Sequence, residues 1–280
     1  MAQPDDMILW LGLGAVLGAC FGSAAALLAD RLPRGQPVGM TRSACRGCGA
    51  ALRWWELVPL ASALWLRGRC ARCGAAIPVW LWQAELAGLV LGMATGWLML
   101  QPGAAPLGVF DALAIWVLLA LGLSDLRSYR LPDSLTAALL LLALAAAIMP
   151  ATWPGLTGAG LDLDLSPQGM PVQAVLGAVV GAVLFWVLAA GYQALRGNAG
   201  MGAGDIRLMA GIGALVWPHL GPLGLAHVTL IAGVSGLVMA ALRAARRGRG
   251  LRRGLHGRIR LPFGACLALA AIAVRLTIAA

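Results

Sequence analysis

The nine residues Gly200-Met-Gly-Ala-Gly-Asp-Ile-Arg-Leu208 stand between two apolar segments, since a long one ends before them and another begins within them. Three of the first five residues are glycines, and the single acid, Asp205, follows them directly. Glycines let a backbone or a substrate approach closely and permit a non-helical entry into the next helix. An acid beside a membrane span is costly and indicates function. The stretch therefore predicts a helical membrane protein with a functional carboxylate at the mouth of a helix.

The composition of the 280-residue chain agrees with a membrane protein, because 60% of the residues are hydrophobic and only 11% are charged. Several apolar runs reach the roughly 18–20 residues that are needed to cross hydrocarbon. The net charge is +10, and arginine supplies all 21 basic residues of the Lys and Arg class. In a membrane protein such charge sets topology and meets anionic headgroups, so it predicts contact with lipids and no nucleic-acid partner.

We expect an all-α polytopic bundle of about eight transmembrane helices. The apolar segments that predict them cover residues 7–29, 79–101, 107–124, 134–150, 172–195, 205–218, 222–242 and 261–279. Nearly all arginines lie on or beside alternate connections, which the positive-inside rule places in the cytoplasm. The first six residues carry acid and no basic side chain, so we expect a retained first helix with its N-terminus outside. Asp125 and Asp205 then both lie at the cytoplasmic face.

The connection after the first segment contains two C-x-x-C pairs, Cys45 with Cys48 and Cys70 with Cys73, which are separated by 21 residues. Two such pairs complete a tetrahedral site for zinc or a similar thiophilic ion. Four cysteine ligands leave no open position for water, so the predicted role is structural. A pair of reactive or redox thiols is the alternative, and disulfides fit a reducing cytoplasm less well.

Asp125 ends the third apolar segment and Asp205 opens the sixth, so the two carboxylates could meet if those helices are neighbours. Two carboxylates that share a site hold one proton between them. The charged member can then act as general base on a water while the protonated one hydrogen-bonds a peptide carbonyl, as in aspartic proteases. For Asp205 alone, an N-cap at the glycine-rich turn or an ion pair with Arg207 stays open.

The remaining acids near the predicted spans have simpler explanations. Asp111, near the outer end of the third segment, is expected to have an interfacial or paired structural role. Asp133 follows Pro132 and is expected to cap a helix. Asp30 ends the first segment and is expected to be solvated or locally paired. Glu85, near the start of the second segment, stays open between a structural and a functional role.

Together these residues resemble the bacterial type IV prepilin peptidases, which are membrane aspartic peptidases of the Gly-x-Gly-Asp kind. The resemblance runs in order through nearly the whole chain. Its motifs are Gly22-Ser23, Asp30-Arg-Leu-Pro33, Ser43-Ala-Cys-Arg-Gly-Cys48, Leu66-Arg-Gly-Arg-Cys-Ala-Arg-Cys73, Ala84-Glu-Leu86, Asp125 with Leu131-Pro-Asp133, Gly200 to Leu208, and Leu261-Pro-Phe-Gly264. The chain departs from the family pattern at Arg46, where Pro is usual, at Ala265, where Pro is usual, and at Arg207, where Lys is usual.

The resemblance implies removal of the leader from type IV prepilins or type II secretion pseudopilins. Cleavage would follow a Gly at the cytoplasmic face of the bacterial inner membrane, with Asp125 and Asp205 as the catalytic pair. It also implies N-methylation of the new N-terminus with S-adenosylmethionine, for which Gly68 is the matching position. The expected division is a first helix over 1–29, a cysteine loop with the methyltransferase region over 30–78, and a peptidase domain over 79–280.

Two other functions are compatible with the same segments. An ion-coupled transporter would use Asp125 and Asp205 to bind a cation, although the closed cysteine loop and the lack of an internal repeat argue against it. A catalytically inactive pilus-assembly factor would tolerate replacement of either aspartate.

Overall fold

The computed structural model describes residues 4–39, 42–98, 100, 109–148, 166, 169–197, 201–246 and 261–279. Within these residues every regular element is a helix, and the only β pairing is two isolated bridges. The predicted all-α class is thus confirmed. The chain divides into two compact units, Met1–Ala104 and Ala105–Ala280.

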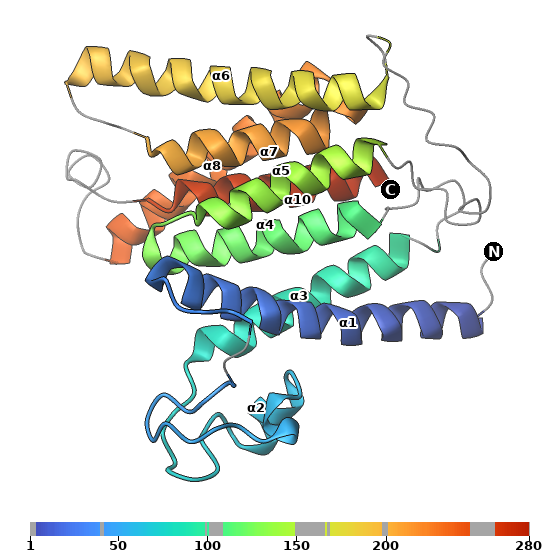
Figure 1. Ribbon diagram of the computed structural model, residues 1–280, viewed down its shortest axis with the longest axis vertical. Coiled ribbons are helices and arrows are strands. Elements are labelled where there is room, and N and C mark those ends of the chain that lie inside the picture. The colour runs from blue at the N-terminus through green and yellow to red at the C-terminus, as the bar shows by residue number, and fades with distance from the viewer. Residues whose placement is uncertain are drawn as a thin grey trace. The chain divides into compact units, whose positions relative to one another are not determined.

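The first unit contains α1 (Pro4–Arg31) and α3 (Val79–Leu98), which pack closely along their lengths (Figure 1). Glycines make this approach possible, since a Cβ added to Gly18 would overlap the backbone of Gly88, and one added to Gly92 would overlap that of Gly14. Spacing small residues every four positions lets helix backbones meet in membranes, where no hydrophobic force drives helices together. Helices α1 and α3 can therefore pack this closely because the residues at their crossing have no side chains.

Between α1 and α3 the chain forms the cysteine loop, with the short helices η1 (Leu32–Arg34), η2 (Trp54–Leu57) and α2 (Ala61–Trp65). The two C-x-x-C turns repeat one local structure, because each is closed by an antiparallel bridge, Ala44 to Ala51 and Arg69 to Ala76. Each turn also ends in a glycine with positive φ, Gly49 at 69° and Gly74 at 70°. Glycine adopts this left-handed conformation without strain.

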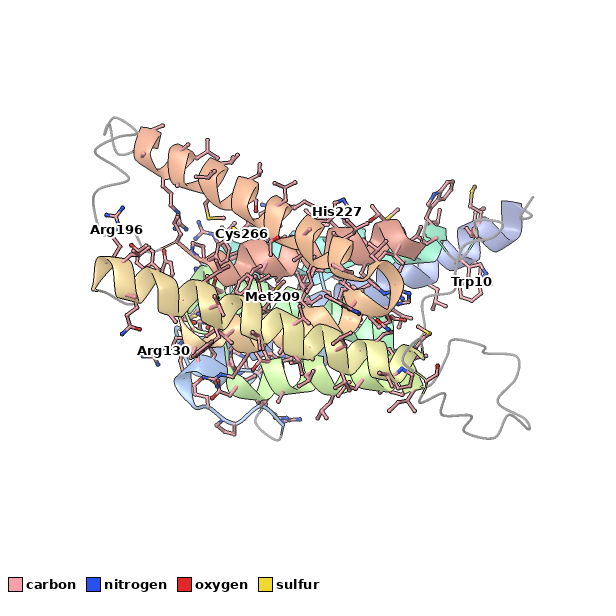
Figure 2. All side chains as sticks on the ribbon, turned by 90° about the horizontal axis from the view of Figure 1, so that it is seen from above. Trp10, Arg130, Arg196, Met209, His227 and Cys266 are labelled. Carbon is pink, nitrogen blue, oxygen red and sulfur yellow. The ribbon has the colours of Figure 1, made fainter. Side chains whose placement is uncertain are left out.

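The second unit is a bundle of six described helices: α4 (Val109–Ser128), α5 (Asp133–Ile148), α6 (Met170–Arg196), α7 (Ala203–Leu220), α8 (Pro222–Arg246) and α10 (Phe263–Ala279). Helix α10 contacts α4, α7 and α8, and α7 packs between α5 and α6 (Figure 1). The core lies along α7 and α10, where Met209 and Cys266 are buried (Figure 2). Glycine again permits the closest crossing, because a Cβ on Gly177 would overlap the backbone of Gly213.

All eight predicted spans coincide with helices, although α7 begins two residues earlier than predicted and α8 extends four residues further. Among the described residues, four helices are long and apolar enough to cross a membrane, namely Met7–Arg34, Val109–Ser128, Met170–Arg196 and Pro222–Ala245. Asp133–Ile148 and Phe263–Ala279 are shorter apolar helices. Eight spans therefore stay a prediction, while a membrane protein with several spans is supported.

Three parts of the sequence lie outside the described residues. These are the connection after the fourth predicted span, which contains Asp162 and Asp164, most of the arginines between α8 and α10, and Gly200 at the start of the glycine-rich stretch. Two other basic residues are placed, since Arg130 and Arg196 lie at the same end of the second unit (Figure 2). This agrees with the expectation that arginines gather on alternate connections.

Candidate active site and metal centre

Asp125 lies in the last turns of α4, where it is only 6% exposed. The backbone N–H of Ala265 donates a hydrogen bond of 2.9 Å to its Oδ2. Ala265 belongs to the first turn of α10, and the first N–H groups of a helix have no partner within the helix and favour an anion. The N-terminus of α10 therefore binds this carboxylate.

Gly264 explains how α10 comes so close to Asp125. A Cβ at this position would lie 3.1 Å from the Oδ2 of Asp125 and 2.9 Å from Cδ1 of Leu131. The Leu261-Pro-Phe-Gly264 motif thus has a structural role that the sequence analysis did not assign. The sequence did contain a signal for this role. Gly264 stands just inside a predicted helix, where glycine lowers helix stability, so its presence there indicates a close contact.

Asp205 is the third residue of α7, whose N-cap is Gly202 in an extended conformation. Its own backbone N–H donates to the carbonyl of Gly202 at 3.1 Å, and no side-chain cap is formed. The N-cap alternative for Asp205 is therefore wrong, because the helix starts earlier than the charge pattern indicated. The Asp205 carboxylate instead lies next to Gly202, since a Cβ built on that glycine would be 3.9 Å from its Oδ2.

Arg207 is not the partner of Asp205 that the sequence left open. Its guanidinium forms an ion pair with Asp133, at the first residue of α5, and its Nε donates to the carbonyl of Ala203 at 3.3 Å. Four residues along a helix bring side chains to one face, whereas two residues place them on different sides. The helical register therefore separates Arg207 from Asp205.

The two acids lie at the same end of the second unit, where α4 ends and where α7 and α10 begin (Figure 1). Each acid lies at the start of a different helix, since Asp125 accepts from the first turn of α10 and Asp205 belongs to the first turn of α7. The Leu131 side chain packs against the start of α7 and the start of α10. Cβ atoms built on Gly204 and on Gly264 would lie 3.1 Å and 2.9 Å from it. The glycines before Asp205 and Ala265 therefore let one leucine fill the space between two helix starts.

The four loop cysteines form a cluster in the first unit. Their sulfur atoms all lie within 4.8 Å of one another, and the Sγ atoms of Cys45 and Cys73 are 3.7 Å apart. Four sulfurs at 2.3 Å from a zinc ion in a tetrahedron would be about 3.8 Å apart. All four cysteines are free thiols, so the structure forms no disulfide among them. The donor set fits a structural metal ion.

Local hydrogen bonds shift the pKa values of Cys45 and Cys73 in opposite directions. The backbone N–H groups of Cys48 and Gly47 lower the pKa of the Cys45 thiol to about 6. The N–H of Ala75 favours the Cys73 thiolate, but the hydrogen bonds of the Cys73 thiol with the neighbouring sulfurs, together with partial desolvation, outweigh this and raise the pKa of Cys73 to about 11. Thiolates are the species that bind metal, so an ion would release the protons that the cluster still holds.

Gly68, predicted to matter for methyl transfer, lies in the turn between α2 and the second C-x-x-C pair with φ of 67°. Its N–H donates to the carbonyl of Ala63 at 2.9 Å, and its carbonyl accepts from Ile77 at 2.7 Å. A side chain at this φ would be strained. The conformation gives this glycine a structural reason to be present, and its role in methyl transfer stays a prediction.

A cavity of about 450 Å³ lies between the cysteine loop and the adjoining parts of α1 and α3. Glu85, whose role was open, lies in its wall. The Oε1 of Glu85 accepts from Ser23 Oγ at 3.0 Å and the Oε2 accepts from the N–H of Leu60 at 2.8 Å. Asp30, also in the wall, is paired with Arg34 and Arg46 at 2.8 Å and 2.7 Å, as the local pairing predicted.

Asp111 has the paired structural role that was expected, and its partner is Arg275 in α10. Two contacts join them, Nε to Oδ1 at 3.0 Å and Nη2 to Oδ2 at 2.9 Å. Asp111 is 6% exposed and Arg275 is 3% exposed. This pair joins α4 to α10 across 164 residues of sequence, so no local pattern could reveal it.

Comparison with known proteins agrees with these features. Residues 16–99 match the model for the bacterial peptidase A24 N-terminal domain, and residues 112–241 match that for the type IV leader peptidase family. A relative from Burkholderia pseudomallei strain 1026b is 37% identical over 245 residues, which are 85% of this chain and 68% of the relative. A relative from Dickeya chrysanthemi is 33% identical over 219 residues, which are 75% of this chain and 68% of the relative.

Both relatives are named prepilin leader peptidase/N-methyltransferase, as is one from Neisseria gonorrhoeae that is 34% identical over 74% of this chain and 64% of its own length. No solved structure matches the chain. The matched ranges include both aspartates and all four loop cysteines. The chain belongs to the type IV leader peptidase family.

Proposed function

We propose that this protein cleaves the leader from type IV prepilins or type II secretion pseudopilins, after a Gly, with Asp125 and Asp205 as its catalytic pair. The observation that carries the proposal is the position of Asp125, buried at the end of α4 and held by the Ala265 N–H, at the same end of the second unit as Asp205 in the first turn of α7. The names of the relatives supply the substrate class.

The proposed chemistry follows from two carboxylates that share one proton. The charged carboxylate takes a proton from a water molecule, and that water attacks the scissile peptide carbonyl. The protonated carboxyl donates a hydrogen bond to the carbonyl oxygen, where negative charge develops. The Ala265 N–H fixes Asp125 through Oδ2, which orients the carboxyl group before substrate arrives. No metal ion is needed in this step, so the cysteine cluster keeps a structural role.

We further propose that the catalytic end faces the cytoplasm of a bacterial inner membrane, with the N-terminus outside. The support is the excess of arginine on alternate connections, together with Arg130 and Arg196 at the end that also contains Asp125 and Asp205. We retain the division by role into 1–29, 30–78 and 79–280. In this division α3 belongs to the peptidase region by its sequence position, although it packs on α1 in the first unit.

A second activity, N-methylation of the new N-terminus with S-adenosylmethionine, is favoured by the printed names of the relatives and by the cavity in the first unit. We propose zinc as the ion held by Cys45, Cys48, Cys70 and Cys73, which would fold the loop that forms one side of the cavity. The loop has little core of its own, so metal binding would supply folding free energy.

Cleavage of a prepilin with a Gly cleavage site by the purified protein in proteoliposomes tests the peptidase proposal. The parent is compared with Asp125→Asn and Asp205→Asn, and Asp162→Asn serves as a matched control in a predicted connection. We expect cleavage by the parent and the control only. A parent that leaves the prepilin intact and takes up a solute would favour the transporter, and cleavage by either Asn variant would make that aspartate structural.

A further inference from the structure

We propose that the cavity of the first unit binds an organic cation, either a methylsulfonium donor or a primary ammonium group, against the carboxylate of Glu85. The inference rests on the N-methyltransferase activity proposed above and names the place in the chain where that reaction occurs. Its first support is the cavity itself, whose volume of about 450 Å³ lies within the range of small-molecule sites.

The cavity is built from parts that are distant in sequence. Ser23 and Leu27 contribute from α1, Leu81 and Glu85 from α3, and Cys45 and Cys70 from the two halves of the cysteine loop. Folding of the loop therefore creates one wall, while the glycine-packed pair of α1 and α3 provides the other. A structural metal beside a binding cavity explains why a loop without its own core is kept in one shape.

Glu85 is distinguished from the other acids of this cavity by its partners. It accepts hydrogen bonds from the hydroxyl of Ser23 and from the backbone N–H of Leu60, which are both neutral donors. Among the described residues no ion pair involves Glu85, whereas Asp30 is paired with two arginines. A half-buried carboxylate without a cationic partner attracts a cation from solution, because the electrostatic interaction is stronger there than in bulk water.

Glu56 also lines the cavity but has a different task. Its Oε2 accepts from the backbone N–H of Arg53 at 2.6 Å and forms the cap of η2. The residue is only 9% exposed. Its carboxylate is therefore used by the loop, which leaves Glu85 as the acid for a ligand.

The backbone at Leu60 gives a further reason to place function at Glu85. Leu60 has φ of 60° and ψ of −46°, and the N–H of Ala61 donates to the carbonyl of Pro59 at 2.6 Å. Pro59, Leu60 and Ala61 therefore form a γ-turn with positive φ at its central residue, which is a rare and strained conformation. Strained backbone persists where surrounding structure holds it, and it clusters at ligand sites. Glu85 holds this turn through the Leu60 N–H, so the turn also fixes the carboxylate.

Other lining residues fit the remaining groups of a methylsulfonium donor such as S-adenosylmethionine. Trp82 offers an aromatic surface for a heteroaromatic ring or a cation. Arg31 and Arg42 offer guanidinium groups for a carboxylate. The acceptor ammonium first loses a proton to water, and the lone pair of the resulting amine forms the C–N bond with the methyl group while the C–S bond breaks with its electron pair left on sulfur. The products are a thioether and a secondary ammonium. Glu85 stabilises whichever cation enters, and no proton transfer is assigned to it.

Direct binding of S-adenosylmethionine to the full chain in detergent, measured by calorimetry, tests the inference without any turnover. In Glu85→Gln the amide oxygen can still accept from Leu60 and the amide nitrogen can donate to Ser23, so only the charge is lost. We expect binding to weaken roughly 10-fold or more. Glu56→Gln is the matched control, with an expected change below about 3-fold. Metal content and helical circular dichroism report whether each variant is folded.

A second arm measures binding of a short peptide with a free N-terminal amine against its N-acetylated form. Weaker binding of S-adenosylmethionine alone by Glu85→Gln identifies the methyl donor as the cationic ligand, and weaker binding of the free-amine peptide alone identifies the acceptor. Ala63→Phe narrows the cavity from α2 and should abolish binding even if the Gln variant does not fold.

Two results would overturn the inference. Unchanged binding of both probes by Glu85→Gln, or a larger loss in Glu56→Gln, would remove Glu85 from the site while leaving methylation in place. A parent protein that binds neither probe and methylates no substrate would instead remove the N-methyltransferase proposal itself, and the inference with it.

Discussion

The buried ion pair between Asp111 and Arg275 gives the sharpest prediction about what holds the second unit together. Arg275→Met removes the guanidinium and leaves the Asp111 carboxylate buried without its cation. Asp111→Leu leaves the guanidinium in the same situation. The double variant Asp111→Leu/Arg275→Met removes both charges and replaces them with apolar side chains.

The structure sets the size of each effect. The pair is bidentate, with contacts of 3.0 Å and 2.9 Å, and its residues are 6% and 3% exposed, so water cannot replace either partner. Loss of one partner of such a pair costs about 3–5 kcal/mol, while replacing both by apolar groups is close to neutral. At about 2–4 °C per kcal/mol, each single variant should unfold roughly 6–20 °C below the parent.

Thermal unfolding in one detergent, followed by the fluorescence of the tryptophans and by loss of monodisperse protein, measures these shifts. We expect two unstable single variants and a double variant within a few degrees of the parent. A single variant as stable as the parent would mean that the charge is solvated and that the pair does not join α4 to α10. A double variant as unstable as the single ones would mean that the ion pair stabilises the fold by itself.

Three further predictions test other parts of the structure. In Gly264→Ala the new methyl group lies 3.1 Å from an oxygen of Asp125 and 2.9 Å from Leu131, so the Asp125 or Leu131 side chain or the start of α10 must shift, and kcat for leader cleavage should fall roughly 10–100-fold. In Gly233→Ala the added Cβ meets nothing within 4 Å, so kcat should be unchanged. Gly18→Leu should separate α1 from α3 and make the first unit sensitive to protease, and equal resistance to the Gly12→Leu control would contradict the glycine-packed crossing. After removal of metal with a chelator, the lowered pKa of Cys45 makes it largely thiolate at pH 7, so mass spectrometry should find it alkylated first, and alkylation that is equally fast with metal bound would argue against a metal site.

The positions of the helices could be predicted from the sequence because two independent signals agree. Apolar runs locate each segment, and arginines mark alternate connections, so an error in one segment would disturb the whole alternation. The boundaries were less accurate at the glycine-rich stretch, where α7 begins at Ala203 and places Asp205 inside the first turn. Glycines give no hydrophobic signal, so the charge at Asp205 alone suggested where the helix begins.

The close contacts inside the bundle were not predicted, although part of the signal was present. Glycines recur every fourth residue at 14, 18 and 22 and again at 88, 92 and 96, a spacing that favours close helix crossing. The pairing of Asp111 with Arg275 spans 164 residues, and no local pattern relates them. Arg207 was considered for Asp205, yet the ion pair that it makes is with Asp133, because that pairing depends on how α5 meets α7.

Of the candidate site, the cysteines and the two aspartates were recognised because their chemistry requires particular residue types at particular spacing. The hydrogen bond from Ala265 to Asp125 was missed because its donor is a backbone N–H, which any residue except proline carries. This chain has Ala at the position where the family pattern has Pro, so the hydrogen bond to Asp125 depends on that departure. Glu85 stayed open because its partners come from α1 and from a strained turn, neither of which sequence spacing reveals.

The most direct test of the central claim is a double-mutant cycle on leader cleavage with Asp125→Asn, Asp205→Asn and the double variant. The rate of a single turnover is measured for each protein at saturating prepilin. If the two carboxylates act as one catalytic unit, each single variant should lose roughly 100-fold or more, and the double variant should lose little beyond that. Independent and additive losses, or a single variant that cleaves at the parent rate, would contradict a shared catalytic site.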